Sequence, residues 1–210
     1  MELNKDLIIV HFQEGFFDKS NQQLKNTVKN NLQPLVDAAL KTDIHLSFWE
    51  DSTVNGSVKS VIEIPQLGSD KVSRIEAPGG LNLFYKLHGP EVILSGGWFG
   101  ACINGAIESI MTAFFNTTVL LATGRLTIRM QQNAVYKFSE LLADMSNKNI
   151  KNTIKSAFDN STVPSKPEVQ QRGLRYSIIR SKTQETIEER VVVPAPNQPS
   201  DMFDIVFLLD

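Results

Sequence analysis

The sequence is poor in several features that would each point to a particular class of protein. Its 210 residues include a single cysteine, Cys102, which excludes an internal disulfide. The formal net charge is −2, so the basic surface typical of nucleic-acid-binding proteins is missing. No run approaches the roughly 18 apolar residues that span a bilayer, and residues 1–6 are too polar for a signal peptide. We therefore expect a cytoplasmic protein that binds neither nucleic acid nor membranes.

Strands and helices alternate in the first part of the sequence. Residues 7–10 are a continuous apolar run, which is the pattern of a strand buried on both faces of a parallel sheet. Residues 21–41 carry apolar side chains at helical spacing, and Pro34 is expected to kink or split this helix. Residues 44–49 form the next predicted strand, so the three segments make a right-handed βαβ unit.

The alternation continues to about residue 160. It predicts an α/β fold with three αβα layers and a mostly parallel sheet. The further predicted elements are short strands at 61–64 and 72–75, a short helix at 82–87, a strand at 92–94, a helix from Cys102, a strand at 118–123, and helices at 130–145 and 152–158.

The last part of the chain has a different composition, with prolines on both sides of two strand-like segments. Residues 174–180 and 187–193 are predicted to form a β-hairpin. Residues 203–209 are predicted to be an apolar terminal strand or anchor, which needs a place on its own domain or on a neighbouring subunit. We therefore predict an α/β domain over residues 1–160 and a C-terminal extension over residues 161–210.

The most informative stretch of the sequence surrounds Cys102. Apolar residues 92–94 lead into Gly96 and Gly97, and the predicted helix begins at Cys102. The free amides of a first helical turn carry a partial positive charge, which tends to lower the pKa of a thiol and to make it a better nucleophile. The alternative is that Cys102 is a small buried packing residue. The residues alone leave both interpretations open.

Polar residues follow the first two predicted strands. His11 comes directly after the first strand, and Glu50 and Asp51 follow the second. Because ligands bind at the carboxyl edge of open α/β sheets, His11 is a candidate acid, base or ligand. The alternatives are a loop histidine that is hydrogen-bonded to backbone, and a solvated loop for Glu50 and Asp51.

These segments resemble the isochorismatase-like cysteine hydrolases, a family that includes nicotinamidases and N-carbamoyl amidases. The family's nucleophile lies in a segment of the form V-L-x-G-x-x-x-x-x-C-V, and residues 93–103 read ILSGGWFGACI, with Cys102 at the nucleophile position. The family's D-x-Q-x-x-F motif is matched at Gln13 and Phe16, whereas His11 replaces the aspartate. The resemblance extends over about residues 6–158 and implies the αβα fold.

The resemblance also implies roles for other residues. The family uses an Asp-Lys-Cys triad, for which Lys71 is the nearest lysine and Arg74 the next cation. The backbone amides of Ala101 and Cys102 would form the oxyanion hole. Nicotinamidases bind a metal through an aspartate and histidines after the second strand, but no histidine follows Trp49 there, so we expect neither a metal nor another cofactor. The predicted pocket residues are Gln13, Phe16, Trp49, Trp98 and Phe99, although aromatic residues at strand ends more often belong to the core.

Two functions are consistent with these features. In the first, Cys102 attacks an amide or related bond of a small molecule, with His11 as the base and Lys71 as the candidate cation. In the second, the protein is a catalytically inactive relative that serves as an interaction or structural subunit, because His11 has replaced the aspartate. A nucleotide-binding function is weaker, since Gly96-Gly97 does not complete a G-x-G-x-x-G fingerprint. By resemblance we expect a homo-oligomer, with the C-terminal extension as a candidate interface.

Overall fold

We analysed the protein as a computed structural model, which describes residues 5–17, 22–51, 53, 59–65, 70–82, 84–98, 101–116, 125–136, 173–180, 185–191 and 201–209. The elements among these residues are β1 (Lys5–Val10), the 3₁₀ turn η1 (Glu14–Phe16), α1 (Gln22–Leu40), β2 (Ile44–Glu50), β3 (Val72–Glu76), η2 (Pro78–Gly80), β4 (Glu91–Gly96), α2 (Cys102–Asn116), β5 (Leu126–Gln131), η3 (Gln132–Ala134), β6 (Gly173–Arg180), β7 (Glu185–Val191) and β8 (Asp201–Leu209). Neither described α-helix is long and apolar enough to cross a membrane.

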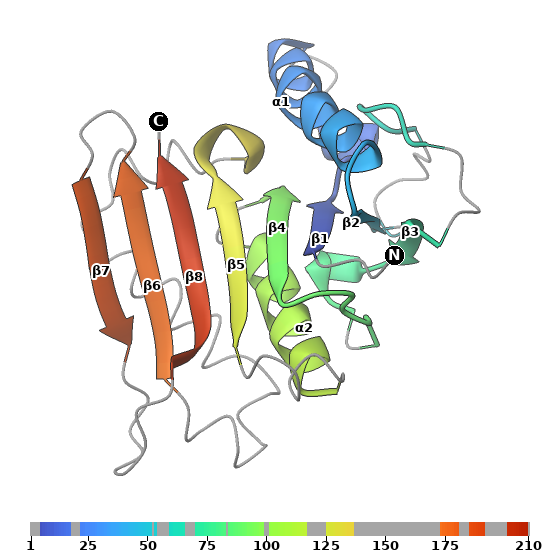
Figure 1. Ribbon diagram of the computed structural model, residues 1–210. Coiled ribbons are helices and arrows are strands. Elements are labelled where there is room, and N and C mark those ends of the chain that lie inside the picture. The colour runs from blue at the N-terminus through green and yellow to red at the C-terminus, as the bar shows by residue number, and fades with distance from the viewer. Residues whose placement is uncertain are drawn as a thin grey trace.

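The strands form one eight-stranded sheet in the order β3-β2-β1-β4-β5-β8-β6-β7, which Figure 1 shows from β7 on the left to β3 on the right. The pairs from β3 through to β6 are parallel, and only β7 runs antiparallel to its neighbour. The order reverses beside β1, because the chain moves outward to β2 and β3 and then returns to β4. This confirms the predicted α/β class with a mostly parallel sheet.

The strands after residue 160 belong to this same sheet. The predicted hairpin forms as β6 and β7, which pair from Leu174 with Val191 to Arg180 with Glu185. The predicted apolar terminal strand forms as β8, which lies between β5 and β6 and is parallel to both. The division of the chain into two domains at residue 160 stays a prediction, and β8 is the strand that joins the two parts.

One face of the sheet is covered by α1. The helix turns Val28, Leu32, Val36 and Ala39 inward, and these residues pack in one buried cluster with alternate residues of the strands, including Leu7 of β1. Burying a side chain such as leucine or valine contributes about 1.5–3 kcal/mol, so this stripe holds the helix in place. The helix runs without a break through Pro34, and the predicted split at that residue is therefore wrong.

The opposite face is covered by α2. Ile8 and Val10 alternate with the residues that face α1 and are fully buried. On α2, Ile103, Ala106 and Ile110 are also fully buried, and the helix contacts β1, β4 and β5. Helices on both faces complete the predicted αβα layers and explain why β1 is apolar on both sides.

The fifth strand lies outside the segment in which a strand was predicted. The sequence predicts a helix from Met130, but β5 includes Met130 and η3 follows it. Along β5, Leu126, Ile128 and Met130 are buried while the residues between them are more exposed, which is the period of a strand. The predicted strand at 118–123 and helix at 152–158, and most of the predicted helix at 130–145, lie outside the described residues.

Two short predicted elements do not form. Residues 61–64 contain no strand, although Ser60 makes an isolated bridge to Gln13. The described residues of the segment 82–87 are not helical, because the Asn82 side chain accepts from the Phe84 amide and donates to the Glu76 carbonyl. These local hydrogen bonds compete with a helical turn. The predicted strand at 72–75 is confirmed as β3.

The tightest approach in the sheet is between β4 and β1. Gly96 has φ +97°, and a Cβ atom there would lie 2.0 Å from the carbonyl oxygen of Val10. The next residue, Gly97, donates its N–H to that same oxygen at 3.0 Å. Glycine is required at position 96 both for the positive φ and for the space. This contact sets how the loops after β1 and β4 leave the sheet.

We predict that Gly96→Ala lowers the free energy of unfolding by about 2–4 kcal/mol, because strain and a backbone clash occur together. The matched control is Gly79→Ala, since Gly79 has φ +60° but nothing within 4 Å of an added Cβ. That variant should lose only about 1 kcal/mol. Urea denaturation of both variants measures the difference, and equal losses would show that the contact at Val10 relaxes freely.

Candidate functional site

His11 lies at the carboxyl end of β1 in an unusual backbone conformation. Its φ is +52°, which is rare for a residue with a side chain and costs about 1–3 kcal/mol. The side chain is fully buried and stacks on Phe16, with the ring centroids 4.4 Å apart. Its Nε2 lies 3.2 Å from the carbonyl oxygen of Ala77. His11 is therefore an ordered inward-facing residue and not a solvated loop histidine.

The contacts of His11 determine which ring nitrogen carries the proton. A carbonyl oxygen can only accept, so the hydrogen bond to Ala77 requires a proton on Nε2 of the neutral ring. Nδ1 then carries a bare lone pair, and it is buried with no hydrogen-bond partner among the described residues. Burial lowers the pKa of His11 below its ordinary value, against the raising effects of the Ala77 carbonyl and of the charges on Asp51 and Glu76. Near neutral pH, His11 is thus a neutral base with a free acceptor atom.

Asp51 lies at the carboxyl end of β2, on the same edge of the sheet as His11. Gln13 fixes its backbone, because the Gln13 amide donates to the Asp51 carbonyl at 3.2 Å and accepts from the Asp51 N–H at 2.9 Å. The Asp51 carboxylate accepts from the hydroxyl and the N–H of Thr53 and from the N–H of Gly79. Burial by itself would raise the pKa of Asp51, but these hydrogen bonds, together with the charge of His11, lower it. Asp51 is buried and does not belong to a solvated loop.

Cys102 is the first residue of α2 and is half-buried. Burial raises the pKa of its thiol, and the negative charge of Asp51 raises it further. Hydrogen bonds from the backbone of Trp98 and of Cys102 itself act in the opposite direction but do not prevail. The expectation of a lowered thiol pKa at the helix start is therefore wrong for this structure. Desolvation outweighs the amides, so the uncharged thiol of Cys102 is favoured over the thiolate.

The 3₁₀ turn η2 (Pro78–Gly80) connects these residues. The carbonyl oxygen of Ala77 accepts from Nε2 of His11 and from the N–H of Gly80 at 2.8 Å. Gly80 in turn packs against Cys102 so closely that an added Cβ would lie 2.0 Å from the Cys102 carbonyl oxygen. His11, Asp51 and Cys102 are therefore gathered at one edge of the sheet around a single turn.

The two cations considered from the sequence are placed elsewhere. Lys71 precedes β3, and its ammonium donates to the carbonyl of Leu40 at 3.0 Å and to that of Thr42. It thus caps the end of α1 at the amino edge of the sheet, about 17 Å along a five-residue strand from the other edge. Arg74 lies within β3 and forms an ion pair with Glu50. The structure does not bring Lys71 together with His11 and Cys102.

The two amides predicted to form the oxyanion hole, those of Ala101 and Cys102, have different hydrogen-bond partners in this structure. The N–H of Ala101 donates to the carbonyl of Trp98 at 3.1 Å, so this amide is already engaged. The N–H of Ile103 donates to the same carbonyl at 3.2 Å. The backbone amides that act on the Cys102 sulfur are those of Trp98 and Cys102. Donation to a bound oxyanion from Ala101 would require that this turn open.

The predicted pocket residues have different surroundings. Trp49 is fully buried on the face covered by α2, where its indole N–H donates to the hydroxyl of Ser47. Trp98 is half-buried and packs against Phe17 and Tyr136. Gln13 and Phe16 hold Asp51 and His11 in place, as described above, and Phe99 lies outside the described residues. Potential metal ligands of the described residues gather at the opposite, amino edge, and they are Asp6, His45 and His88.

Comparison with known proteins gives a structural likeness without a sequence match. No family model matches the sequence, and no curated protein matches it. An isochorismatase-like hydrolase from Alkaliphilus metalliredigens aligns at 12% identity over 67% of this chain and 90% of its own, with a TM-score of 0.47. The nicotinamidase from Bacillus subtilis aligns at 15% identity over 77% and 96%, also at 0.47. The N-carbamoylsarcosine amidase from Thermoplasma acidophilum aligns at 11% identity over 67% and 91%, at 0.46.

These solved structures carry the names of the family that the Cys102 segment resembles, but their TM-scores are below 0.5. The identities are too low to transfer the role of any residue, so the chemistry proposed for the site rests on His11, Asp51 and Cys102 themselves. Asp51 could have been found from the sequence only as a carboxylate at the end of a predicted strand, on the same edge as His11.

The buried His11 makes the stability of the protein depend on pH. Its pKa in the folded protein lies below the ordinary value of 6.5, so the unfolded chain takes up a proton first as the pH falls. The contribution of His11 is complete above about pH 6.5 and is lost as the pH falls toward the lower folded-state pKa. We predict that the urea midpoint falls less between pH 7.5 and 5.5 in His11→Gln than in the wild type. Parallel pH dependences of the two proteins would contradict a buried neutral His11.

Proposed function

We propose that the protein is a cysteine hydrolase that acts on an amide or related C–N bond of a small molecule. The observation that carries the proposal is the bare, buried Nδ1 of His11 at the same sheet edge as the Cys102 thiol. A thiol with a raised pKa is a poor nucleophile until a neighbouring base removes its proton. A neutral imidazole whose other nitrogen is already bound is suited to that task.

The reaction proceeds in two halves. His11 Nδ1 takes the proton of Cys102, directly or through one water, while Sγ forms a bond to the substrate carbonyl carbon. The resulting oxyanion would be stabilised by backbone amides at the start of α2, among them that of Cys102. The C–N bond then breaks, and the imidazolium gives its proton to the departing nitrogen. Water, deprotonated by His11, hydrolyses the thioester and restores the thiol.

Asp51 has an electrostatic role in this scheme. It is ionised and buried, and its charge opposes the loss of His11's positive charge after proton transfer. The same charge disfavours the thiolate of Cys102. Asp51 therefore favours the protonated form of His11 and disfavours a free thiolate on Cys102. In this scheme the proton moves to His11 as the sulfur bonds to the substrate carbon. Asp51 acts on His11 through its charge, whereas the ring is held by the Ala77 carbonyl and by stacking on Phe16.

Alkylation of the single cysteine tests the proposed base. We predict that iodoacetamide modifies Cys102 near pH 7 at least about tenfold faster in the wild type than in His11→Gln, because a tenfold rate corresponds to about 1.4 kcal/mol of assistance. The matched control is Lys71→Met, which removes the capping cation at the other edge and should leave the rate unchanged. Intact-mass analysis measures the rates, and circular dichroism confirms that each variant is folded.

Hydrolysis is measured with a panel of small primary amides and N-carbamoyl compounds by release of ammonia. Cys102→Ser and His11→Gln should each abolish detectable turnover of any substrate that the wild type accepts. The alternative function, an inactive relative that serves as a structural subunit, is favoured by the raised pKa of Cys102. Modification of Cys102 only after denaturation, or equal alkylation rates in the wild type and His11→Gln, would establish that alternative and overturn the hydrolase.

A further inference from the structure

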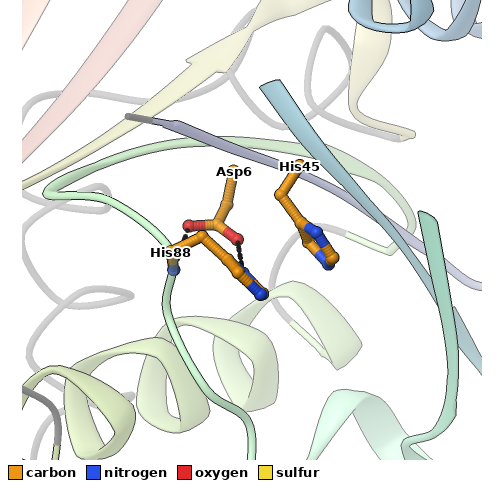
Figure 2. A group of neighbouring side chains, drawn as sticks. All are labelled: Asp6, His45 and His88. Carbon is orange, nitrogen blue, oxygen red and sulfur yellow. Dashed lines mark hydrogen bonds and ion pairs between the residues drawn. The ribbon is translucent and has the colours of Figure 1, made fainter. Parts of the chain in front are cut away.

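A second group of titratable side chains lies at the amino edge of the sheet, far from Cys102. Asp6 of β1 and His45 of β2 are direct neighbours in the register of the parallel pair. His88 comes from the loop before β4, and its backbone enters the sheet three residues later. Figure 2 shows the three side chains side by side, with Asp6 bound to His88 and with His45 next to them. The hydrolase proposal uses none of these residues.

Asp6 is a fully buried carboxylate that is held by four donors. Oδ1 accepts from the hydroxyl of Tyr85 at 2.7 Å and from Nδ1 of His88 at 2.9 Å. Oδ2 accepts from the N–H of His88 at 3.0 Å and from that of Gly89 at 3.2 Å. These bonds fix the carboxylate in position. They also orient the His88 ring, whose side chain is 27% exposed and so provides a route from solvent.

As for His11, the hydrogen-bond partners of His45 indicate which ring nitrogen carries the proton. The Ser73 hydroxyl donates to Ser47, so at 2.9 Å it accepts from Nε2–H of His45. Nδ1 is then bare, and it is buried with no hydrogen-bond partner among the described residues. The ring also stacks on His88, with the ring centroids 3.6 Å apart. His45 is therefore a buried imidazole whose Nε2 is bound to Ser73 and whose Nδ1 makes no hydrogen bond.

We propose that Asp6, His45 and His88 form a binding site for a divalent transition-metal ion of the Zn²⁺ type. One ligand atom from each residue lies within 4.8 Å of the others. Two imidazole nitrogens and one carboxylate oxygen suit zinc and its neighbours in the first transition row, and three protein ligands leave one position for water. Packing alone does not explain why an acceptor nitrogen is buried unpaired beside a carboxylate, whereas a Lewis acid would satisfy it.

The surroundings provide the outer hydrogen bonds that metal ligands usually have. Tyr85 and Gly89 hold Asp6, and Ser73 holds the distal nitrogen of His45. In a tetrahedral zinc site the ligand atoms lie about 3.4 Å apart, as follows from Zn–N distances of about 2.0–2.1 Å. The most widely separated ligand atoms must therefore close by up to about 1.4 Å, while Asp6 Oδ1 and His88 Nδ1, now 2.9 Å apart, must separate by about half an ångström. The His45 and His88 rings, now stacked at 3.6 Å, would turn toward the ion, and Nδ1 of His88 would release its proton to solvent.

This site departs from the sequence-based expectation of no metal, which considered only the segment after Trp49. It also does not depend on the hydrolase proposal, since it lies at the other edge of the sheet. The three histidines of the sequence are His11, His45 and His88, so each can be tested separately. The remaining soft ligand, Cys102, is distinguishable because a thiolate bound to Co²⁺ adds a charge-transfer band that imidazole and carboxylate ligands lack.

The test is a titration of the chelator-treated, desalted full-length protein with Zn²⁺, by competition against a chromophoric chelator, and with Co²⁺, by visible absorption. We predict one equivalent of metal per chain and a Co²⁺ spectrum without a thiolate band. Affinity should fall at least about tenfold in His45→Gln and in His88→Gln. The matched controls, His11→Gln and Cys102→Ser, should bind like the wild type. Because His88 is the most exposed ligand, His88→Gln carries the least risk of unfolding, which circular dichroism monitors.

Three outcomes would overturn the site. The first is the absence of stoichiometric binding by the folded wild type. The second is binding that is equal in the wild type, His45→Gln and His88→Gln, because it would not involve these residues. The third is binding that is lost in His11→Gln or Cys102→Ser, which would place the ion at the carboxyl edge instead. A metal-dependent rise in the melting temperature of the wild type, absent from folded His88→Gln, would support the proposal independently.

Discussion

The close contact between β1 and β4 is the constraint on which the other features depend. Gly96 can approach the carbonyl of Val10 only because it has no side chain, and the N–H of Gly97 then binds that same oxygen. The pairing continues from this point back to Lys5 and Glu91. It therefore fixes the relative position of both ends of the two strands. At the carboxyl end, the loops to His11 and Cys102 start from adjacent points. At the amino end, the chain enters β4 at Glu91 beside Lys5, and the preceding loop brings His88 to Asp6.

Burial shifts the pKa values of His11 and Cys102 in opposite directions at the carboxyl edge. Desolvation keeps His11 neutral and keeps Cys102 as a thiol, because in each case the charged form is disfavoured. The resting pair is thus uncharged, and the nearby ionised Asp51 favours charge on His11 only. Such a pair would form the ion pair during reaction and not before it. This differs from the pre-formed thiolate expected of an exposed cysteine at a helix start.

A buried histidine with one bound and one unpaired ring nitrogen lies at each edge of the sheet. His11 and His45 each use one nitrogen on a fixed acceptor and keep the other bare and buried. Unpaired buried nitrogens are costly, so their presence on two histidines among the described residues calls for an explanation. At the carboxyl edge the bare nitrogen of His11 lies at the same edge of the sheet as Cys102, and we propose that it accepts the proton of the thiol. At the amino edge the bare nitrogen of His45 is grouped with Asp6 and His88, which is the composition of a metal site.

The sequence by itself determined the elements whose signals are local. The apolar run of β1, the helical stripe of α1 and the glycines before Cys102 each follow from the spacing of side chains, and so does the αβα class that they imply. The strand β5 was not predicted, although Leu126, Ile128 and Met130 alternate, because the spacing of apolar residues after Met130 favours a helix that begins there. The irregular segment after Asn82 was missed because side-chain hydrogen bonds compete with the helix there.

Only the tertiary structure decided which residues meet. The sequence placed His11 and Cys102 at strand ends, but the pairing of β1 with β4 brought them to one edge, and the capping of α1 took Lys71 to the other. The pKa of Cys102 depends on burial and on Asp51, which are properties of the assembled fold. Likewise Asp6, His45 and His88 are separated by about forty residues at each step, and strand register alone makes them neighbours. Local spacing predicts elements, whereas sites arise where distant elements share an edge.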